Sequence, residues 1–141
     1  MGKKKVILDT NILISALGWE GNERIVFNEV IEGKIELIVS FKQLGEILRV
    51  MEYPKFKFTD EQKDKFLLIL LEIASLVTTT STVDAIKADP DDNLILEPAN
   101  EIKIDYIISG NGHLLKLKEF KGAKIIAAKE FLRISKIAIF L

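Results

Sequence analysis

The fold is decided near the start of the chain by the stretch KVILDTN, residues 5–11. Residues 4–8 form a short β-branched run that ends in the apolar residues 6–8, which predicts a central first strand. Asp9 ends this run, and a short helix is expected over residues 11–17. If the strand belongs to a parallel sheet, Asp9 lies at the carboxyl edge, where open α/β folds bind their ligands.

Strand-like and helix-like segments alternate along the rest of the chain, which predicts helices layered on a parallel sheet. No internal repeat or long linker divides the sequence, so residues 1–141 are expected to form a single domain. The expected strands are 4–8, 35–39, 76–80 and 105–109, with 124–126 as a possible edge strand. The expected helices are 11–17, 22–32, 40–52, 59–75, one entered at Pro90 with Pro98 inside it, 113–117 and 127–135.

Composition excludes several classes of protein. With 48% hydrophobic and 29% charged residues the chain is globular, and its net charge of −1 gives no general attraction to nucleic acid. The chain has no cysteine, which excludes a disulfide framework, a zinc–thiolate site and a cysteine nucleophile. Its apolar runs are too short for a signal peptide or a membrane span, so a cytoplasmic protein is expected.

Acids and amides follow the apolar runs that predict strands, or begin the helices after them. Asp9 and Asn111 each follow such a run, and Asp92 closes the acidic cluster 89–93. Clustered carboxylates repel one another unless a cation neutralises them, so these positions predict a divalent-metal site. Oxygen ligands favour Mg²⁺ or Mn²⁺, and such ions assist the hydrolysis of phosphate esters.

Each of these residues also has an ordinary structural interpretation. Asp9 can form a turn or cap a helix, and Asp92 can be a solvated charge in a first helical turn. Glu46 falls off the apolar stripe of its helix, which is typical of a solvated side chain. His113 can be a ligand or a surface residue, and the basic patches 3–5 and 55–57 can contact phosphate or only water.

Four segments in order resemble the PIN-domain family, most closely the subgroup of toxins from prokaryotic toxin–antitoxin pairs. Together they cover the chain from about residue 4 to residue 133. The segments are VILDTNILISAL (6–17), QLGEIL (43–48) with YPKF (53–56), DPDDN (89–93), and DYIISGNGHLL (105–115).

The resemblance implies a three-layer α/β/α sandwich with a central parallel sheet of four to five strands. It also implies an Mg²⁺- or Mn²⁺-dependent ribonuclease that cleaves RNA, forms homodimers and has a cognate antitoxin protein. Carried over by position, the acidic metal ligands and catalytic residues are Asp9, Glu46 and Asp92. The supporting residues, matched in the same way, are Thr10, Asn11, Asn93 and Ser109.

The chain departs from the family pattern at Asn111, where an Asp normally follows the Gly. An amide can still offer its carbonyl oxygen to a hard cation, but it supplies no charge. The first functional hypothesis is therefore an endoribonuclease of the PIN type, with Asn111 as a neutral metal ligand. The alternative is a catalytically weakened PIN domain that binds RNA or a protein partner.

Two further interpretations complete the predictions from sequence. A phospho-receiver domain also carries acids at strand ends, but it needs an Asp after the third strand, and residues 78–81 contain none. The apolar segment 137–141 is a candidate surface for a dimer or a partner, or else packs onto the core.

Overall fold

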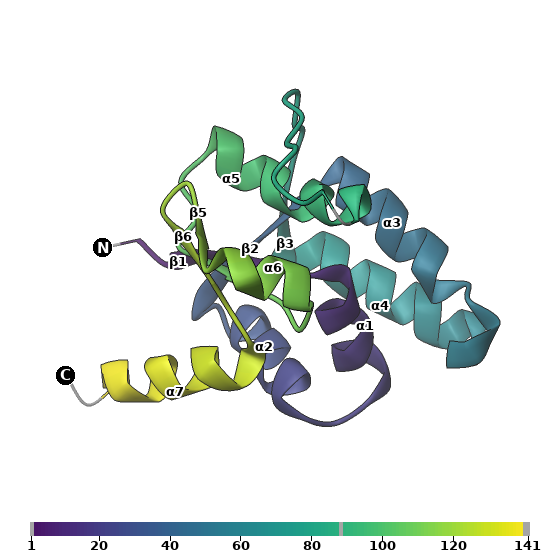
Figure 1. Ribbon diagram of the computed structural model, residues 1–141. Helices are drawn as coiled ribbons and strands as arrows, with labels where there is room; N and C mark the ends of the chain where they lie inside the picture. Colours follow the sequence, from purple (N-terminus) through teal and green to yellow (C-terminus); the bar gives the residue numbers. More distant parts are fainter. Residues whose placement is uncertain (1, 88, 140–141) are drawn as a thin grey trace.

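The computed structural model describes residues 2–87 and 89–139, and these form a sheet with helices on both faces (Figure 1). The three-layer α/β/α architecture predicted from the sequence is confirmed. The strands are β1 (Lys4–Leu8), β2 (Ile35–Ser40), β3 (Ala74–Val77), β4 (Tyr106–Ile108), β5 (Glu119–Phe120) and β6 (Ala123–Ile126). The helices are α1 (Thr10–Gly18), α2 (Asn22–Ile31), α3 (Phe41–Met51), α4 (Asp60–Ile73), α5 (Glu97–Glu101), α6 (Gly112–Leu117) and α7 (Ala128–Ile139), with the 3₁₀ helices η1 (Pro54–Phe56) and η2 (Pro90–Leu96).

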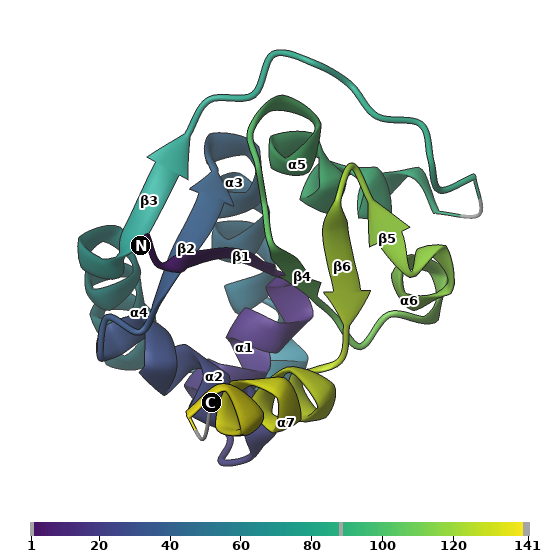
Figure 2. The same ribbon diagram turned by 90° about the vertical axis from the view of Figure 1, so that its left-hand side faces the viewer.

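The sheet has the strand order β3-β2-β1-β4-β6-β5, with β1 near its centre (Figure 2). β1 pairs in parallel with β2 on one side and with β4 on the other. Successive connections therefore run outward in opposite directions from β1. This arrangement creates a topological switch point between β1 and β4, where open α/β sheets form a crevice beyond the carboxyl ends of their strands.

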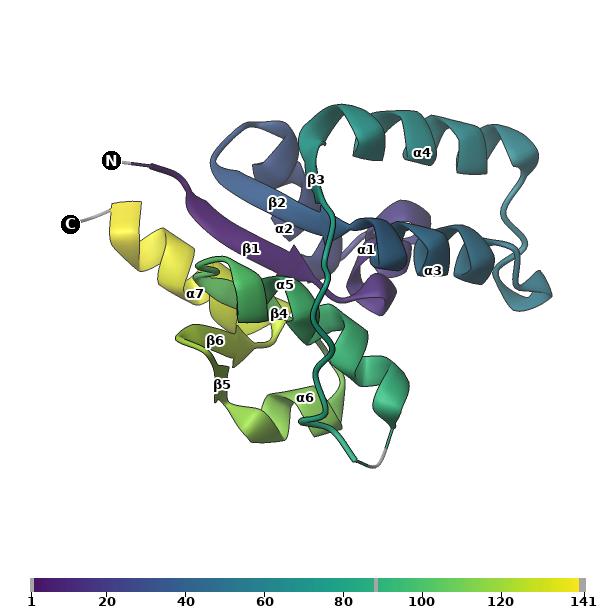
Figure 3. The ribbon, with the colours of Figure 1, turned by 90° about the horizontal axis from the view of Figure 1, so that it is seen from above.

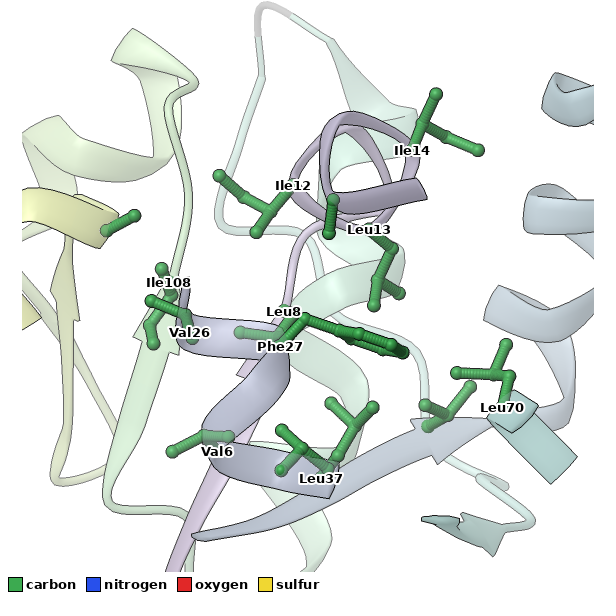
Figure 4. Close-up of a cluster of buried hydrophobic side chains, with 14 of the residues drawn as sticks. Val6, Leu8, Ile12, Leu13, Ile14, Val26, Phe27, Leu37, Leu70 and Ile108 are labelled. Atoms are coloured by element: carbon green, nitrogen blue, oxygen red, sulfur yellow. The ribbon is translucent and has the colours of Figure 1, made fainter. Parts of the chain in front are cut away.

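Alternate residues of β1 face opposite layers, which is why its buried residues 6–8 are all apolar. Val6 and Leu8 belong to a core cluster that includes side chains of α1, α2, α4 and α7 (Figure 4). Ile7 belongs to a second cluster that includes side chains of η2, α5, α6 and β6. A strand buried on both faces must be nearly continuously hydrophobic, as the run 6–8 is.

Two details of the sheet differ from the sequence predictions. The third strand is β3, Ala74–Val77, and not 76–80, because α4 ends earlier, at Ile73. The predicted edge strand 124–126 is not an edge, since β6 pairs in parallel with β4 and antiparallel with β5. Among the described residues the sheet thus holds five parallel strands, which agrees with the predicted four to five. It also holds β5, which has only two residues and is too short to show a periodicity in the sequence.

The segment that carries Asp92 also differs from the expected single helix. It is a 3₁₀ helix, η2, followed by the short α5. Pro98 lies in the first turn of α5, where no intrahelical N–H bond is required, and so it does not interrupt a long helix. Of the predicted apolar surface 137–141, Phe140 and Leu141 lie outside the described residues.

In the part of the chain that the structure describes, no helix combines the length and apolar character needed to cross a bilayer.

Candidate active site

Asp9 lies at the switch point, immediately beyond β1. It is 7% exposed, and its backbone N–H donates to the carbonyl oxygen of Ile108 at 2.9 Å, which fixes it beside the end of β4. Its Oδ1 accepts from the backbone N–H of Asn11 and so caps α1. This is the helix-capping role that the sequence analysis gave as the structural alternative for Asp9. Its Oδ2 accepts from the hydroxyl of Ser109 at 2.6 Å. Asp9 therefore has one oxygen engaged in the helix cap and the other oriented by a buried serine.

Glu46 reaches toward the same edge from the middle of α3. The hydroxyl of Thr10 donates to its Oε1, and the guanidinium of Arg49 lies 4.0 Å from its Oε2. Gln43, one turn earlier on α3, donates to the carbonyl oxygen of Leu8 at 2.7 Å. These bonds fasten α3 to the end of β1. The side chain of Glu46 is 19% exposed, so it is less solvated than the phase of its helix suggested.

Asn111 and Asp92 form a direct pair across the crevice. The Oδ1 of Asn111 accepts from the backbone N–H groups of His113 and Leu114 and so caps α6. Because this cap requires an acceptor, the amide NH₂ must point the other way, and it donates to both carboxylate oxygens of Asp92 at 3.2 Å. Nδ1 of His113 lies 3.6 Å from Oδ2 of Asp92. Asn111 thus presents hydrogen-bond donors where an aspartate would present negative charge.

The pKa of Asp92 is raised above 3.8, the ordinary value for an aspartate. Burial is the largest cause, and the negative charges of Asp89 and Asp9 add to it, whereas hydrogen bonds from His113 and Asn111 act in the opposite direction. Because the pKa in the folded state is the higher one, this group stabilises the fold below the unfolded pKa and loses that contribution as pH rises through the folded pKa. The surroundings of Asp92 therefore favour its neutral form, or an ionised form whose charge a cation neutralises.

The donor set fits Mg²⁺ or Mn²⁺. Asp9 and Asp92 are close enough for one charge to influence the other, and a bound cation would relieve that repulsion. Mg²⁺ needs only one or two protein carboxylates because it retains several waters. Within residues 2–87 and 89–139, no three Asp, Glu or His side chains are gathered into a ready-made metal cage. An ion held by two carboxylates and water is therefore the arrangement these residues can support.

A cavity of about 500 Å³ opens beside Glu46, between α3 and η2. Lys42, Arg49 and Glu97 are among its lining residues. Glu97 is buried, and it accepts from the ammonium of Lys42 at 2.8 Å and from the hydroxyl of Thr79 at 3.2 Å. The sequence predictions missed Glu97, Lys42 and Gln43. The available signal for Glu97 was a single acid between the apolar residues 94–96 and 98–99.

The remaining predicted site residues form hydrogen bonds to the site carboxylates or, in the case of Asn93, to the backbone before η2. Thr10 and Ser109 are buried and hold Glu46 and Asp9, respectively. Asn93 is buried, and its Oδ1 accepts from the backbone N–H groups of Ala85 and Ile86, so it fastens the segment before η2. Asn11 contributes its backbone N–H to Asp9, while the residue itself is exposed.

Comparison with known proteins agrees with this geometry. The family model described as the PIN domain matches residues 5–113. No curated protein gives a significant match. The matched segment covers more than half of the chain, and it contains both strands of the switch point together with Asp9, Glu46, Asp92 and Asn111. This chain belongs to the PIN-domain family, whose members are generally nucleases that use divalent metal ions.

Proposed function

We propose that this protein is a metal-dependent endoribonuclease that hydrolyses phosphodiester bonds in RNA. The observation that carries the proposal is the placement of two oriented carboxylates at the switch point: Ser109 holds Asp9 beyond β1, and Asn111, beyond β4, holds Asp92. Carboxylates gathered at the carboxyl edge of a parallel sheet are suited to holding a cation. Family membership supports the same class of reaction.

The residues divide into holding and orienting roles. Asp9 and Asp92 would hold Mg²⁺ or Mn²⁺ together with water, and Glu46 would be the third acid beside the crevice. Asn111 would be a neutral ligand only after its amide turned, because its oxygen caps α6 and its NH₂ faces Asp92. When bound, the ion supplies positive charge to phosphate oxygens and makes water more acidic. Ser109 orients Asp9, and Thr10 orients Glu46. These hydroxyls prevent the carboxylates from turning away from the crevice.

The cationic side chains beside the crevice suit a phosphate-containing substrate. Arg49 is mostly exposed and Lys42 is about half-exposed, and both line the cavity next to Glu46. Each is also attached to an acid, Arg49 to Glu46 and Lys42 to Glu97, which limits how far it can move. They therefore offer directed donors to a phosphate backbone although the chain as a whole is nearly neutral.

The test is an RNA cleavage assay with the full chain. Purified protein is incubated with single-stranded RNA of mixed sequence in Mn²⁺, in Mg²⁺ and in excess chelator. Cleavage is expected in at least one metal and none in chelator, because carboxylates without a cation repel the phosphate. Equal cleavage with and without chelator would contradict the proposal, and so would intact RNA in both metals.

Asn111 favours the second candidate function, a weakened PIN domain that binds RNA or a partner without efficient turnover. The amide NH₂ of Asn111 partly satisfies Asp92, and a cation must compete with those donors. In this alternative the chain retains RNA binding in the presence of metal while cleavage is slow. The family match alone favours neither candidate.

Asn111→Asp tests this role of the amide directly. The new carboxylate faces Asp92 and adds a charge to the site, so Mn²⁺ affinity is expected to rise about tenfold. In chelator the same variant is expected to melt at a lower temperature than the wild type, because two carboxylates then face each other. Titration calorimetry measures the first effect and thermal unfolding the second.

The matched control is Asn28→Asp, which makes the same change of charge at an exposed position on α2. It should leave Mn²⁺ affinity unchanged. If Asn111→Asp binds Mn²⁺ no better than Asn28→Asp, Asn111 does not belong to the metal site.

The proposal extends to a biological role as the toxin component of a toxin–antitoxin pair, in which the chain forms a homodimer and has a cognate antitoxin protein as its partner. The segment resemblance to PIN-domain toxins supports this part, and co-purification with the product of an adjacent gene would test it.

A further inference from the structure

A cluster of four aromatic rings lies where α1 and α3 end, on the side away from the N-terminal ends of the strands. We call Trp19, Tyr53, Phe56 and Phe58 the aromatic platform. Trp19 directly follows α1, and the other three rings belong to η1 and the residues around it. Figure 3 shows α3 running outward from the sheet, with the turn before α4 at its outer end. The platform therefore stands at the rim of the molecule.

The rings form a fixed, partly exposed surface. The planes of Tyr53 and Phe56 are within 4° of parallel and those of Phe56 and Phe58 within 15°, while Trp19 meets both phenylalanines at 6.1 Å. Phe56 and Phe58 also pack against the core, which anchors the cluster. Trp19 and Tyr53 remain 52% and 42% exposed. Two flat rings are thus held in place without being covered.

Two lysines accompany the rings. The ammonium of Lys55 lies 5.1 Å from the centroid of the Phe56 ring, and Lys57 is exposed in a left-handed turn. Neither lysine takes part in an ion pair among the residues that the structure describes. The negative charges of two nearby acids are neutralised by Lys63, which binds Glu52 at 2.8 Å and Asp60 at 3.2 Å. Glu20, the residue after Trp19, is an exposed acid.

The platform is connected to the candidate active site along α3. Glu46 and Arg49 are three residues apart on α3 and so lie on one side of the helix. At 1.5 Å per residue, the end of α3 at Met51 lies about 8 Å from Glu46 along the helix axis, and Tyr53 follows two residues later. Arg49 lies between them with an exposed guanidinium. A short extended strand of nucleic acid can span this distance.

We propose that the aromatic platform stacks unpaired bases of single-stranded RNA, while Lys55 and Lys57 contact the neighbouring phosphates. Exposed aromatic rings combined with cations are how proteins bind single strands without reading their sequence. A duplex cannot use such a surface, because its bases are already paired and stacked. The proposal rests on the proposed ribonuclease function and assigns the surface of this chain on which unpaired bases next to the cleaved bond are held.

The chain contains a single tryptophan, so its fluorescence reports on the platform alone. The probe is an RNA of about 12 nucleotides containing only adenosine and cytidine, which cannot pair with itself. It is titrated into the full chain in excess chelator, so that no cleavage occurs. Stacking on the indole is expected to quench Trp19 emission, and the pre-formed duplex of the same RNA is expected not to.

Tyr53→Leu removes the aromatic face while retaining apolar bulk, and it is expected to weaken binding of the single strand about tenfold. A double variant, Lys55→Gln with Lys57→Gln, should weaken binding and reduce its dependence on salt. The matched control is Phe41→Leu, because Phe41 is 54% exposed at the opposite end of α3. Binding by this control should equal that of the wild type.

The outcomes separate this inference from the proposed function. Quenching by the single strand, weakened in Tyr53→Leu, supports the platform even if the same protein fails to cleave RNA in Mn²⁺. RNA cleavage without quenching, at equal rates in Tyr53→Leu and wild type, overturns the platform and retains the nuclease. Emission that changes with protein concentration alone, and not with RNA, also overturns it, because the rings then contact a second copy of the chain.

Discussion

Asp9→Asn is expected to lower the rate of metal-dependent RNA cleavage by about a thousandfold, equivalent to about 4 kcal/mol of transition-state stabilisation. The substitution removes one negative charge from the crevice and replaces an oxygen that a divalent cation would bind. Asparagine has the same shape, and its remaining oxygen can still accept from the backbone N–H of Asn11. Its amide can donate to Ser109. The fold is therefore retained while the chemistry is lost.

The control for this variant is Asp64→Asn, which makes the same substitution at an exposed position on α4. Cleavage rates are measured for both proteins in Mn²⁺ after purification by one protocol, with melting temperatures recorded in chelator. Asp64→Asn should cleave as the wild type does. If Asp9→Asn is folded and equally active, the nuclease site is not at the β1 edge, or the activity comes from a contaminant.

The strand-end part of the site could be read from the sequence because it depends on local pattern. The apolar run 6–8 before Asp9 is enough to predict β1, and a residue that follows a parallel strand has only one edge of the sheet to occupy. The same reasoning brought Asn111 to that edge. It could not tell which way the amide points, because that depends on the cap of α6 and on Asp92, nineteen residues away.

Side chains presented by helices were harder to predict. The helical phase of Glu46 suggested a solvated position, because periodicity detects only the apolar face that packs on the core. Glu46 lies off that face but is still partly covered, because Thr10 donates to it and it shares the wall of the cavity with Glu97. Glu97 depends on Lys42, fifty-five residues earlier, and no local window relates the two. Long-range polar contacts require the fold before they can be recognised.

Leu37→Ala is expected to lower the free energy of unfolding by about 3 kcal/mol and the melting temperature by about 10 °C. Leu37 has no exposed surface and lies in β2, paired with Val6 of β1 and packed in the cluster shown in Figure 4. Truncation leaves a cavity that the rigid sheet on either side cannot fill. The measurement is thermal and urea unfolding followed by circular dichroism, in chelator, so that bound metal does not add to stability.

Leu68→Ala is the matched control, because Leu68 is 67% exposed on α4 and its truncation should change stability by less than about 0.5 kcal/mol. Equal losses in the two variants would show that β2 is not packed as described. Leu37 lies three residues before Ser40 at the end of β2, and it makes no bond to Asp9, Glu46 or Asp92 among the described contacts. Below its melting temperature, Leu37→Ala should therefore cleave RNA at the wild-type rate. Leu37→Ala should lose stability and keep activity, whereas Asp9→Asn should keep stability and lose activity. The two variants therefore distinguish the packing of the core, which holds the site in place, from the charges of the site, which take part in cleavage.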